Sequence, residues 1–330
     1  MAPPATLNRF RDAGTAAAIL AGACVWTFVS GAASGGDPIP VVAVVSAGAA
    51  ALVVAALVSR GRPWVVPALV VGGAAIVAVA GRAEILTSRP EQGPFGYANA
   101  TGAFYLQATI AGLMLAVSAP RAEGRWIGWL GAAAFAGITL ATGSAAAAGL
   151  LALPAAGFVL SVSRRGRPVM VGMAALFAVA LFGTIVVGSL AGEPGNGTLG
   201  GRIFDERRET LWHQAVTTIG EHPLTGVGPG AFVEDGPLVR IDADARWAHH
   251  GFLQFGAETG IPGMGLVTLA FVWLLVSLAG RSDPAVFTVL GSAALAVFGI
   301  GACVDYLFHF PAITVTAAAL AGAASTHNEA

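Results

Sequence analysis

Two adjacent histidines open the most polar stretch of a chain that is otherwise dominated by Ala, Val, Leu and Gly. His249 and His250 lie in the sequence RWAHHGFLQFGAETGIPGMG, which runs from Arg246 to Gly265. A histidine that titrates near neutral pH is the natural general base for removing a proton from a hydroxyl group. The pair therefore predicts acid–base chemistry at a hydroxyl.

Two further polar residues share a helical spacing with the second histidine. His250, Gln254 and Glu258 stand four residues apart, so a helix over this stretch places them on one face. A glutamate next to an apolar membrane segment is costly unless it is paired or faces a wet cavity. Gln254 and Glu258 therefore form either a solvated interfacial face that caps the next span or a support for the histidines.

Arginine is the second functional residue type near the histidines. The chain has 17 basic residues, all of them arginine. The planar guanidinium group binds oxyanions in a bidentate manner and keeps its charge. A base combined with several arginines at a membrane surface indicates displacement at a sugar whose leaving group is a lipid-linked diphosphate.

Two other motifs near the histidines suggest different ligands. The turn GVGPG (Gly226 to Gly230) could cradle a phosphate with its backbone N–H groups. Its spacing matches neither the P-loop nor the dinucleotide fingerprint, so a tight turn is favoured. Asp242 and Asp244 could join the two histidines around a metal ion. Because no metal-ligand spacing supports that site, neither a metal nor a cofactor is expected.

The rest of the chain must hold these residues in a membrane. It is 56% hydrophobic and only 11% charged, whereas soluble domains are about 25% charged. The net charge of −1 argues against a nucleic-acid partner. Ten apolar segments have the length of a membrane-spanning helix. They cover about 14–35, 39–58, 64–81, 99–118, 126–142, 144–162, 169–190, 262–280, 285–304 and 311–325.

The expected fold is an all-α polytopic membrane protein with one large extracytoplasmic loop that contains short helices. Residues 1–190 hold about seven spans, 191–261 form the loop with the catalytic motif, and 262–330 hold about three more. In the loop, an amphipathic helix is expected from about Ile203 to Ile219, ended by Pro223. Its apolar face carries Leu211 and Ala215, while Arg207, Arg208 and Glu209 point elsewhere.

The arginines predict the orientation in a bacterial cytoplasmic membrane. One set of loops holds ten arginines, whereas the short loops on the other side hold two, Arg82 and Arg89. The arginine-rich side should be cytoplasmic, with both termini inside and the large loop outside. The first apolar run either remains as a span or is a cleaved signal peptide. A glycan donor used outside must arrive already activated, for example on a lipid carrier.

Five segments resemble the O-antigen ligase/polymerase family of polytopic bacterial membrane glycosyltransferases. The family pattern R-x-x-x-W is matched by Arg208 to Trp212, and P-L-x-G-V-G-x-G-x-F by Pro223 to Phe232. The pattern H-N-x-x-L-Q-x-x-A-E-x-G is matched from His249 onward. GPFGYANATGAFYL, which contains Asn99, and DYLFHFP, which begins at Asp305, resemble two further family segments. The resemblance is strongest over Arg208 to Gly263.

The resemblance implies a function and roles for individual residues. His249 is the implied base, and Arg208 is the implied ligand of the diphosphate. The implied donor is a glycan on a polyprenyl diphosphate such as undecaprenyl diphosphate. The glycan would be transferred to a glycan or lipid acceptor at the membrane lipid. The resemblance further implies that the anomeric centre is inverted and that no metal takes part. The same donor serves a ligase and a polymerase.

The chain departs from the family pattern at two positions. His250 replaces the usual Asn, and Ala145 stands where the family often has an Arg. Further substrate-binding candidates are therefore Arg89, Arg202, Arg207, Arg246 and His250. Supporting roles are expected for Gln254, Glu258, Asn99 and Asp305. A transporter or flippase of lipid-linked glycans, and a non-catalytic assembly partner, are the alternative functions.

Overall fold

The computed structural model describes residues 5–81, 93–163, 165–191, 206–232, 247–281 and 285–326, and no strand occurs among them. The expected all-α class is therefore confirmed for these residues. Their helices are α1 (Ala5–Ser34), α2 (Ile39–Val58), α3 (Val65–Ala80), α5 (Ala98–Ser118), α6 (Ala122–Ala141), α7 (Ala145–Leu150), α8 (Ala152–Val162), α9 (Gly166–Leu190), α10 (Glu206–Glu221), α11 (Gly251–Ala279), α12 (Val286–Ala302), η4 (Leu307–His309) and α13 (Pro311–Thr326).

Six of the described segments are long and apolar enough to cross a membrane. They are Asp12–Ser34 of α1, α2, α5, Ala145–Val162 across α7 and α8, α9, and α11. Helices α3, α12 and α13 are apolar but shorter. Each of the ten expected segments falls on a helix, so the sequence located the helices. By length and hydropathy, six crossings are supported rather than ten.

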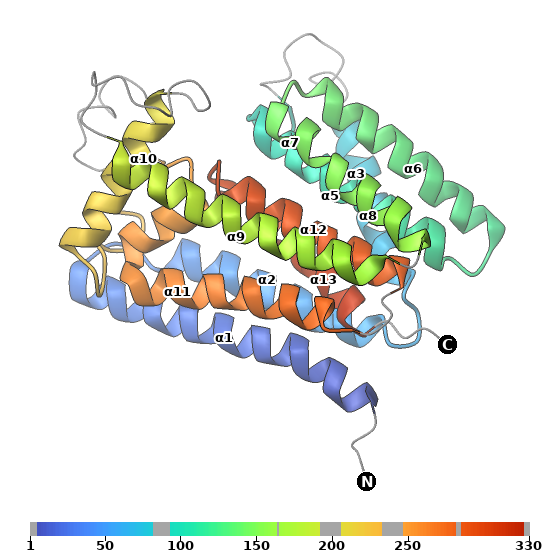
Figure 1. Cartoon of the computed structure of the whole chain (residues 1–330), viewed down its shortest axis with the longest axis horizontal. Helices are drawn as coiled ribbons and strands as arrows, with labels where there is room; N and C mark the ends of the chain where they lie inside the picture. The colour runs from blue at the N-terminus through green and yellow to red at the C-terminus, as the bar shows by residue number, and fades with distance from the viewer. Residues whose placement is uncertain are drawn as a thin grey trace.

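Helix α12 lies at the centre of the bundle and packs against α5, α8, α9, α11 and α13. Fifteen of its residues are buried. In Figure 1, α1, α2 and α11 lie side by side on one flank, and α3, α5 and α6 lie on the other. Helix α10 packs on α9 and α11 near the ends of those helices. The arrangement places α10, the start of α11 and the end of α12 in one region.

Helix α11 is broken at Gly260, where φ is 74° and ψ is 179°. A Cβ at this position would collide with the carbonyl of Leu224, so only glycine fits the backbone here. Pro262 follows the break and has no amide hydrogen to bond the carbonyl of Glu258. The break therefore frees backbone groups that need partners inside a buried region.

The GVGPG turn supplies those partners. The amides of Val227 and Gly228 donate to the carbonyls of Ala257 (2.9 Å) and Glu258 (3.0 Å). The amide of Ile261 donates back to the carbonyl of Pro223 (2.9 Å). Two of the turn's amides are thus committed to the helix break, and the geometry favours the tight-turn interpretation over a phosphate cradle.

The start of α11 lies earlier than the expected span at 262. The helix begins at Gly251, because the ring nitrogen Nδ1 of His250 accepts a hydrogen bond from the amide of Leu253 (3.1 Å) and caps the first turn. Residues 251–259 therefore continue into the following span through the break at Gly260. The polar stretch from Gly251 to Glu258 is helical and lies directly on top of the apolar half of α11.

Candidate active site

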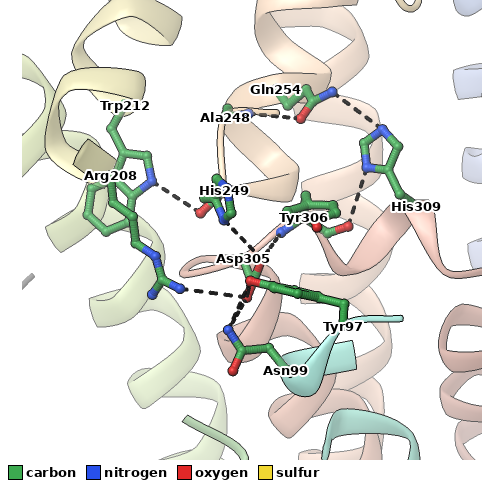
Figure 2. A network of polar contacts seen from close by, with 10 residues as sticks. All are labelled: Tyr97, Asn99, Arg208, Trp212, Ala248, His249, Gln254, Asp305, Tyr306 and His309. Carbon is green, nitrogen blue, oxygen red and sulfur yellow. Dashed lines mark hydrogen bonds and ion pairs between the residues drawn. The ribbon is translucent and has the colours of Figure 1, made fainter. Parts of the chain in front are cut away.

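Asp305 is the centre of a buried polar network between α12 and η4 (Figure 2). It is 3% exposed. Its Oδ2 accepts hydrogen bonds from the Tyr97 hydroxyl and from the Asn99 side-chain amide, both at 2.7 Å. Its Oδ1 accepts from the amide of Tyr306 at 2.8 Å. A carboxylate that receives this many donors is stabilised in its charged form.

The imidazole of His249 lies against this carboxylate. Its Nδ1 is 3.4 Å from Oδ1 of Asp305, at ion-pair distance, and both ring nitrogens are buried without a hydrogen-bond partner among the described residues. The ring of Tyr306 meets it edge-on, with the ring centroids 4.8 Å apart. One ring nitrogen thus faces a carboxylate, and the other is not engaged by any described residue.

The backbone of His249 is held in an uncommon conformation. With φ at 46°, it is the one non-glycine residue with positive φ among those described. Such a conformation costs on the order of 1–3 kcal/mol and persists where surrounding contacts enforce it. Here the indole Nε1 of Trp212 donates to the His249 carbonyl (3.2 Å), and the amide of Gly251 donates to the Asp305 carbonyl (3.1 Å). These bonds hold the imidazole in place.

The R-x-x-x-W motif lies on α10 and faces the same site. Positions four apart on a helix lie on one side, so Arg208 and Trp212 point together toward His249 and Asp305 (Figure 2). Nη2 of Arg208 is 3.8 Å from Oδ2 of Asp305, and the Arg208 side chain is 26% exposed. Arg208 therefore brings a positive charge to the rim of the site, whereas Trp212 is fully buried and anchors its floor.

Charge in the site follows from these contacts. Burial alone would raise the pKa of Asp305, but the close contact with His249, the hydrogen bond from Tyr97 and the charge of Arg208 lower it below its ordinary value. Burial and the neighbouring Asp305 raise the pKa of the Tyr97 hydroxyl. The carboxyl is therefore ionised at neutral pH, and the tyrosine stays protonated as a donor to it.

His250 occupies a different environment from its neighbour. It is fully buried, and its Nδ1 accepts the capping bond from Leu253, so its Nε2 carries the proton that reaches the Thr184 hydroxyl at 2.7 Å. Burial lowers the pKa of His250 to about 3. With both nitrogens engaged, His250 acts as a helix cap, and this geometry offers no free group for a substrate.

Gln254 and Glu258 form a second polar cluster with His309. The Gln254 side chain accepts from the amide of Ala248 (3.1 Å) and donates to Glu258 Oε1 (3.0 Å). Its Nε2 is 3.4 Å from Nε2 of His309 (Figure 2). Gln254 and Glu258 are 2% and 4% exposed, so the interpretation as a solvated interfacial face is wrong. They are satisfied by partners in the fold instead.

Several site residues were not singled out from the sequence. Tyr97, Trp247, Tyr306 and His309 surround the His249 ring or the second polar cluster. Tyr97 and Asn99 lie two residues apart in one family-like segment, and Tyr306 and His309 lie in the segment that begins at Asp305. The signal was therefore the density of aromatic and polar residues in these two short segments of an aliphatic chain.

Most of the remaining arginine and metal-ligand candidates lie outside the residues that the structure describes. Arg89, Arg202 and Arg246, like Asp242 and Asp244, lie outside the described residues. Arg207 is on α10 and precedes Arg208 in the sequence. Within the described ranges, no group of three potential ligands is arranged to hold a metal ion.

One expectation for α10 is wrong. Glu209 is 2% exposed rather than on the polar face, because Leu211, Trp212 and Ala215 bury a wider stripe than predicted. The helix ends at Glu221, two residues before Pro223, as a proline stop predicts. The wider stripe follows from the position of α10, which packs on both α9 and α11 and so buries more than one side.

Comparison with known proteins agrees with the resemblance. Residues 129–268 match the family model described as O-antigen ligase. A search of proteins with curated functions found no match to the chain. The matched segment includes α10, the GVGPG turn and His249, whereas Asn99 and Asp305 lie outside it and join the site through the fold.

Proposed function

We propose that this chain, whose residues 129–268 match the O-antigen ligase family model, is a membrane glycosyltransferase of the ligase type. It transfers a glycan from a polyprenyl diphosphate to an acceptor hydroxyl at the outer face of the bacterial cytoplasmic membrane. The observation that carries the proposal is the His249–Asp305 pair, with Nε2 of His249 unpartnered and Arg208 facing the same carboxylate.

His249 is the base in this proposal. Asp305 keeps the proton on Nδ1, so the lone pair of Nε2 is free to accept the proton of the acceptor hydroxyl. As the hydroxyl proton moves, the imidazole becomes positively charged, and the ionised Asp305 at 3.4 Å stabilises that charge. The acceptor oxygen then attacks the anomeric carbon of the donor sugar.

Arg208 serves the leaving group. The bond between the anomeric carbon and the diphosphate oxygen breaks, and the electron pair stays on the diphosphate. Arg208 sits at the partly exposed rim of the site, 3.8 Å from Asp305, so a diphosphate placed there would meet a guanidinium suited to bidentate binding. In this scheme arginine takes the role that a metal ion plays in other transferases, and attack opposite the leaving group inverts the anomeric centre.

The proposed location follows from the arginine asymmetry and the fold. The site lies at the α10 end of α9 and α11, on the side opposite most of the arginine-rich loops. Both termini are then cytoplasmic, and the site faces outward at the depth where a lipid carrier holds its diphosphate. The apolar half of α11 begins directly below the site, at Ile261.

A polymerase would use the same donor and the same base, and its acceptor would be another carrier-linked glycan. The buried His–Asp pair favours a transferase over a transporter, because moving a lipid-linked glycan requires no proton acceptor at a hydroxyl. The acceptor therefore separates the two enzymatic possibilities.

The test is reconstitution of the purified protein in liposomes with a polyprenyl-diphosphate-linked oligosaccharide and a lipid extract of the host membrane. We expect free polyprenyl diphosphate and an oligosaccharide-bearing acceptor. A ladder of longer carrier-linked glycans would identify a polymerase instead. Movement of the intact donor across the bilayer without release of diphosphate would overturn the proposal in favour of a transporter.

A further inference from the structure

A large cavity lies beside the proposed active site and is separate from its charged groups. Its volume is about 1320 Å³, and it is bounded by α1, α2, α11, α12 and α13 together with the GVGPG turn. His249, Asp305 and Arg208 are not among the residues that line this cavity. Ligand pockets usually measure about 300–1,000 Å³, so this space exceeds what a single sugar requires.

The deep part of the cavity is apolar and follows the direction of the helices. Along α2 the lining runs from Pro40 to Leu52, which corresponds to about 18 Å of helix at 1.5 Å per residue. The facing wall of α11 contributes Phe271 and Leu274. The hydrocarbon core of a bilayer is about 30 Å thick, so the cavity reaches past its middle. Its shape and lining fit an alkyl chain.

The outer end of the cavity is polar. Glu258, Gln254 and His309 line it there, and Asp37 lies at its exposed rim. Burial lowers the pKa of His309 to about 4, so the ring is neutral at pH 7. Among the described lining residues there is no arginine or lysine, and Glu258 and Asp37 supply two carboxyl groups.

The lining chemistry excludes the donor diphosphate from this end. A diphosphate here would face the carboxyl groups of Glu258 and Asp37, with no arginine or lysine among the described lining residues to balance its charge. The cation of the site, Arg208, lies on the other side of the His249 ring. Uncharged hydroxyl groups, in contrast, find acceptors and donors in Glu258, Gln254 and His309.

The polar end of the cavity adjoins the base. Trp247 lines the cavity and precedes His249 by two residues, and its ring stacks on Tyr306 with the centroids 5.8 Å apart. Tyr306 in turn meets the His249 ring at 4.8 Å. One aromatic layer therefore separates a head group at the cavity mouth from the proton acceptor.

We propose that this cavity holds the lipid tail of the acceptor, whose head group is uncharged and rich in hydroxyls. The inference rests on the proposed transferase function and names the acceptor class as a neutral glycolipid. One hydroxyl of the head group reaches past the Trp247–Tyr306 layer to Nε2 of His249, while the donor diphosphate stays with Arg208. The two lipids thus approach the base from different sides.

The test uses two photoreactive probes in phosphatidylcholine liposomes that contain the purified full-length protein. One is a monogalactosyl diacylglycerol with a diazirine in an acyl chain, and the other is phosphatidylglycerol with the same chain. We expect the neutral probe to label peptides of α2 and α11, with about tenfold less labelling by the anionic probe. Equal labelling by both probes would overturn the inference.

Matched variants locate the labelled site. Val45 and Val54 are both on α2, but Val45 lines the cavity, whereas Val54 is 56% exposed and does not line it. We expect Val45→Trp to reduce labelling by the neutral probe about tenfold, because the indole fills the apolar channel. Val54→Trp should leave it within about twofold. Undiminished labelling in Val45→Trp would overturn the proposal.

A second blocking variant guards against misfolding. Leu20→Trp fills the same channel from α1, and variants are compared only when their elution profiles and Tm match those of the wild type. Release of polyprenyl diphosphate is measured in the same preparations. If His249→Ala abolishes release but the neutral probe never labels the cavity, the proposed function stands and this inference fails. If labelling follows the cavity but no release occurs, the cavity assignment stands and the transferase fails.

Discussion

Two polar clusters lie on opposite sides of the Trp247–Tyr306 layer, and they differ in charge. The first combines His249 and Asp305 with the cation of Arg208. The second combines Gln254, Glu258 and His309 and has no cation among the described residues that line its cavity. Both are buried and both are built around the first turns of α11.

The difference suggests a division of labour within one short helical segment. A diphosphate requires positive charge and a partly open rim. Among the described residues of the two clusters, the first cluster offers both through Arg208. Hydroxyl groups require paired donors and acceptors without net charge, and the Glu258 side offers these. The break at Gly260 allows this division, because the GVGPG turn satisfies the freed backbone and closes the rim of the cavity.

The strongest test of the comparison is removal of the base. His249→Ala should lower kcat for glycan transfer by about 10²–10⁴-fold, the usual contribution of general acid–base catalysis. The matched control is His222→Ala, since His222 is exposed, directly follows the end of α10 and belongs to neither cluster. The measurement is polyprenyl diphosphate release by the reconstituted protein. Full activity in His249→Ala would remove the first cluster from the chemistry.

A smaller effect is expected at the cation. Arg208→Ala should lower kcat/KM for the donor by about 10²-fold, and Arg208→Lys should recover only part of it, because an ammonium lacks the planar fork. Arg62→Ala, an exposed arginine on the predicted cytoplasmic side, is the control. Donor titration of the reconstituted protein checks this. If the whole loss instead came from a higher KM for the acceptor, Arg208 would belong to the acceptor site rather than to the donor site.

The second cluster should affect the acceptor more than the donor. Glu258→Gln removes the carboxyl group while keeping a group that can pair with Gln254, so we expect up to about a tenfold loss in kcat/KM for a neutral glycolipid. The KM for the donor should not change. Initial rates at varied acceptor concentration measure this. A loss as deep as that of His249→Ala would mean that the two clusters act as one.

The smallest effect is predicted for the helix cap. The pKa of His250 is lowered in the folded protein, so the unfolded chain binds a proton below about pH 6.5 that the folded protein refuses until about pH 3. Stability is therefore present above pH 6.5 and is lost as the pH falls. His250→Asn keeps a capping side chain and removes this titration.

The expected result for His250→Asn is a fall in Tm between pH 7 and pH 5 that is about 2–4 °C smaller than in the wild type. Transfer activity at pH 7 should stay within about twofold. Thermal unfolding in detergent across this pH range checks the first point. An activity loss like that of His249→Ala would return His250 to the substrate-binding candidates.

Local pattern was enough to locate most helices and to propose His249 and Arg208 as site candidates. Every expected apolar segment lies on a helix, and the spacing from Leu253 and Gln254 back to His249 separated the base position from its neighbour. The pattern was insufficient for Glu209 and for the supposed solvated face of Gln254 and Glu258. Burial at these positions depends on neighbours that are distant in the sequence, which periodicity does not contain.

What the sequence by itself determined is the helical class, the membrane setting and the identity of His249 and Arg208 as candidates, because composition, hydropathy and motif spacing are local properties. Only the tertiary structure decided which carboxylate faces the base. Asp305 is 56 residues from His249, and their contact exists because α12 ends beside the start of α11. It also decided that one histidine caps a helix while its neighbour keeps a free nitrogen, since a positive φ at His249 turns the two rings into different surroundings.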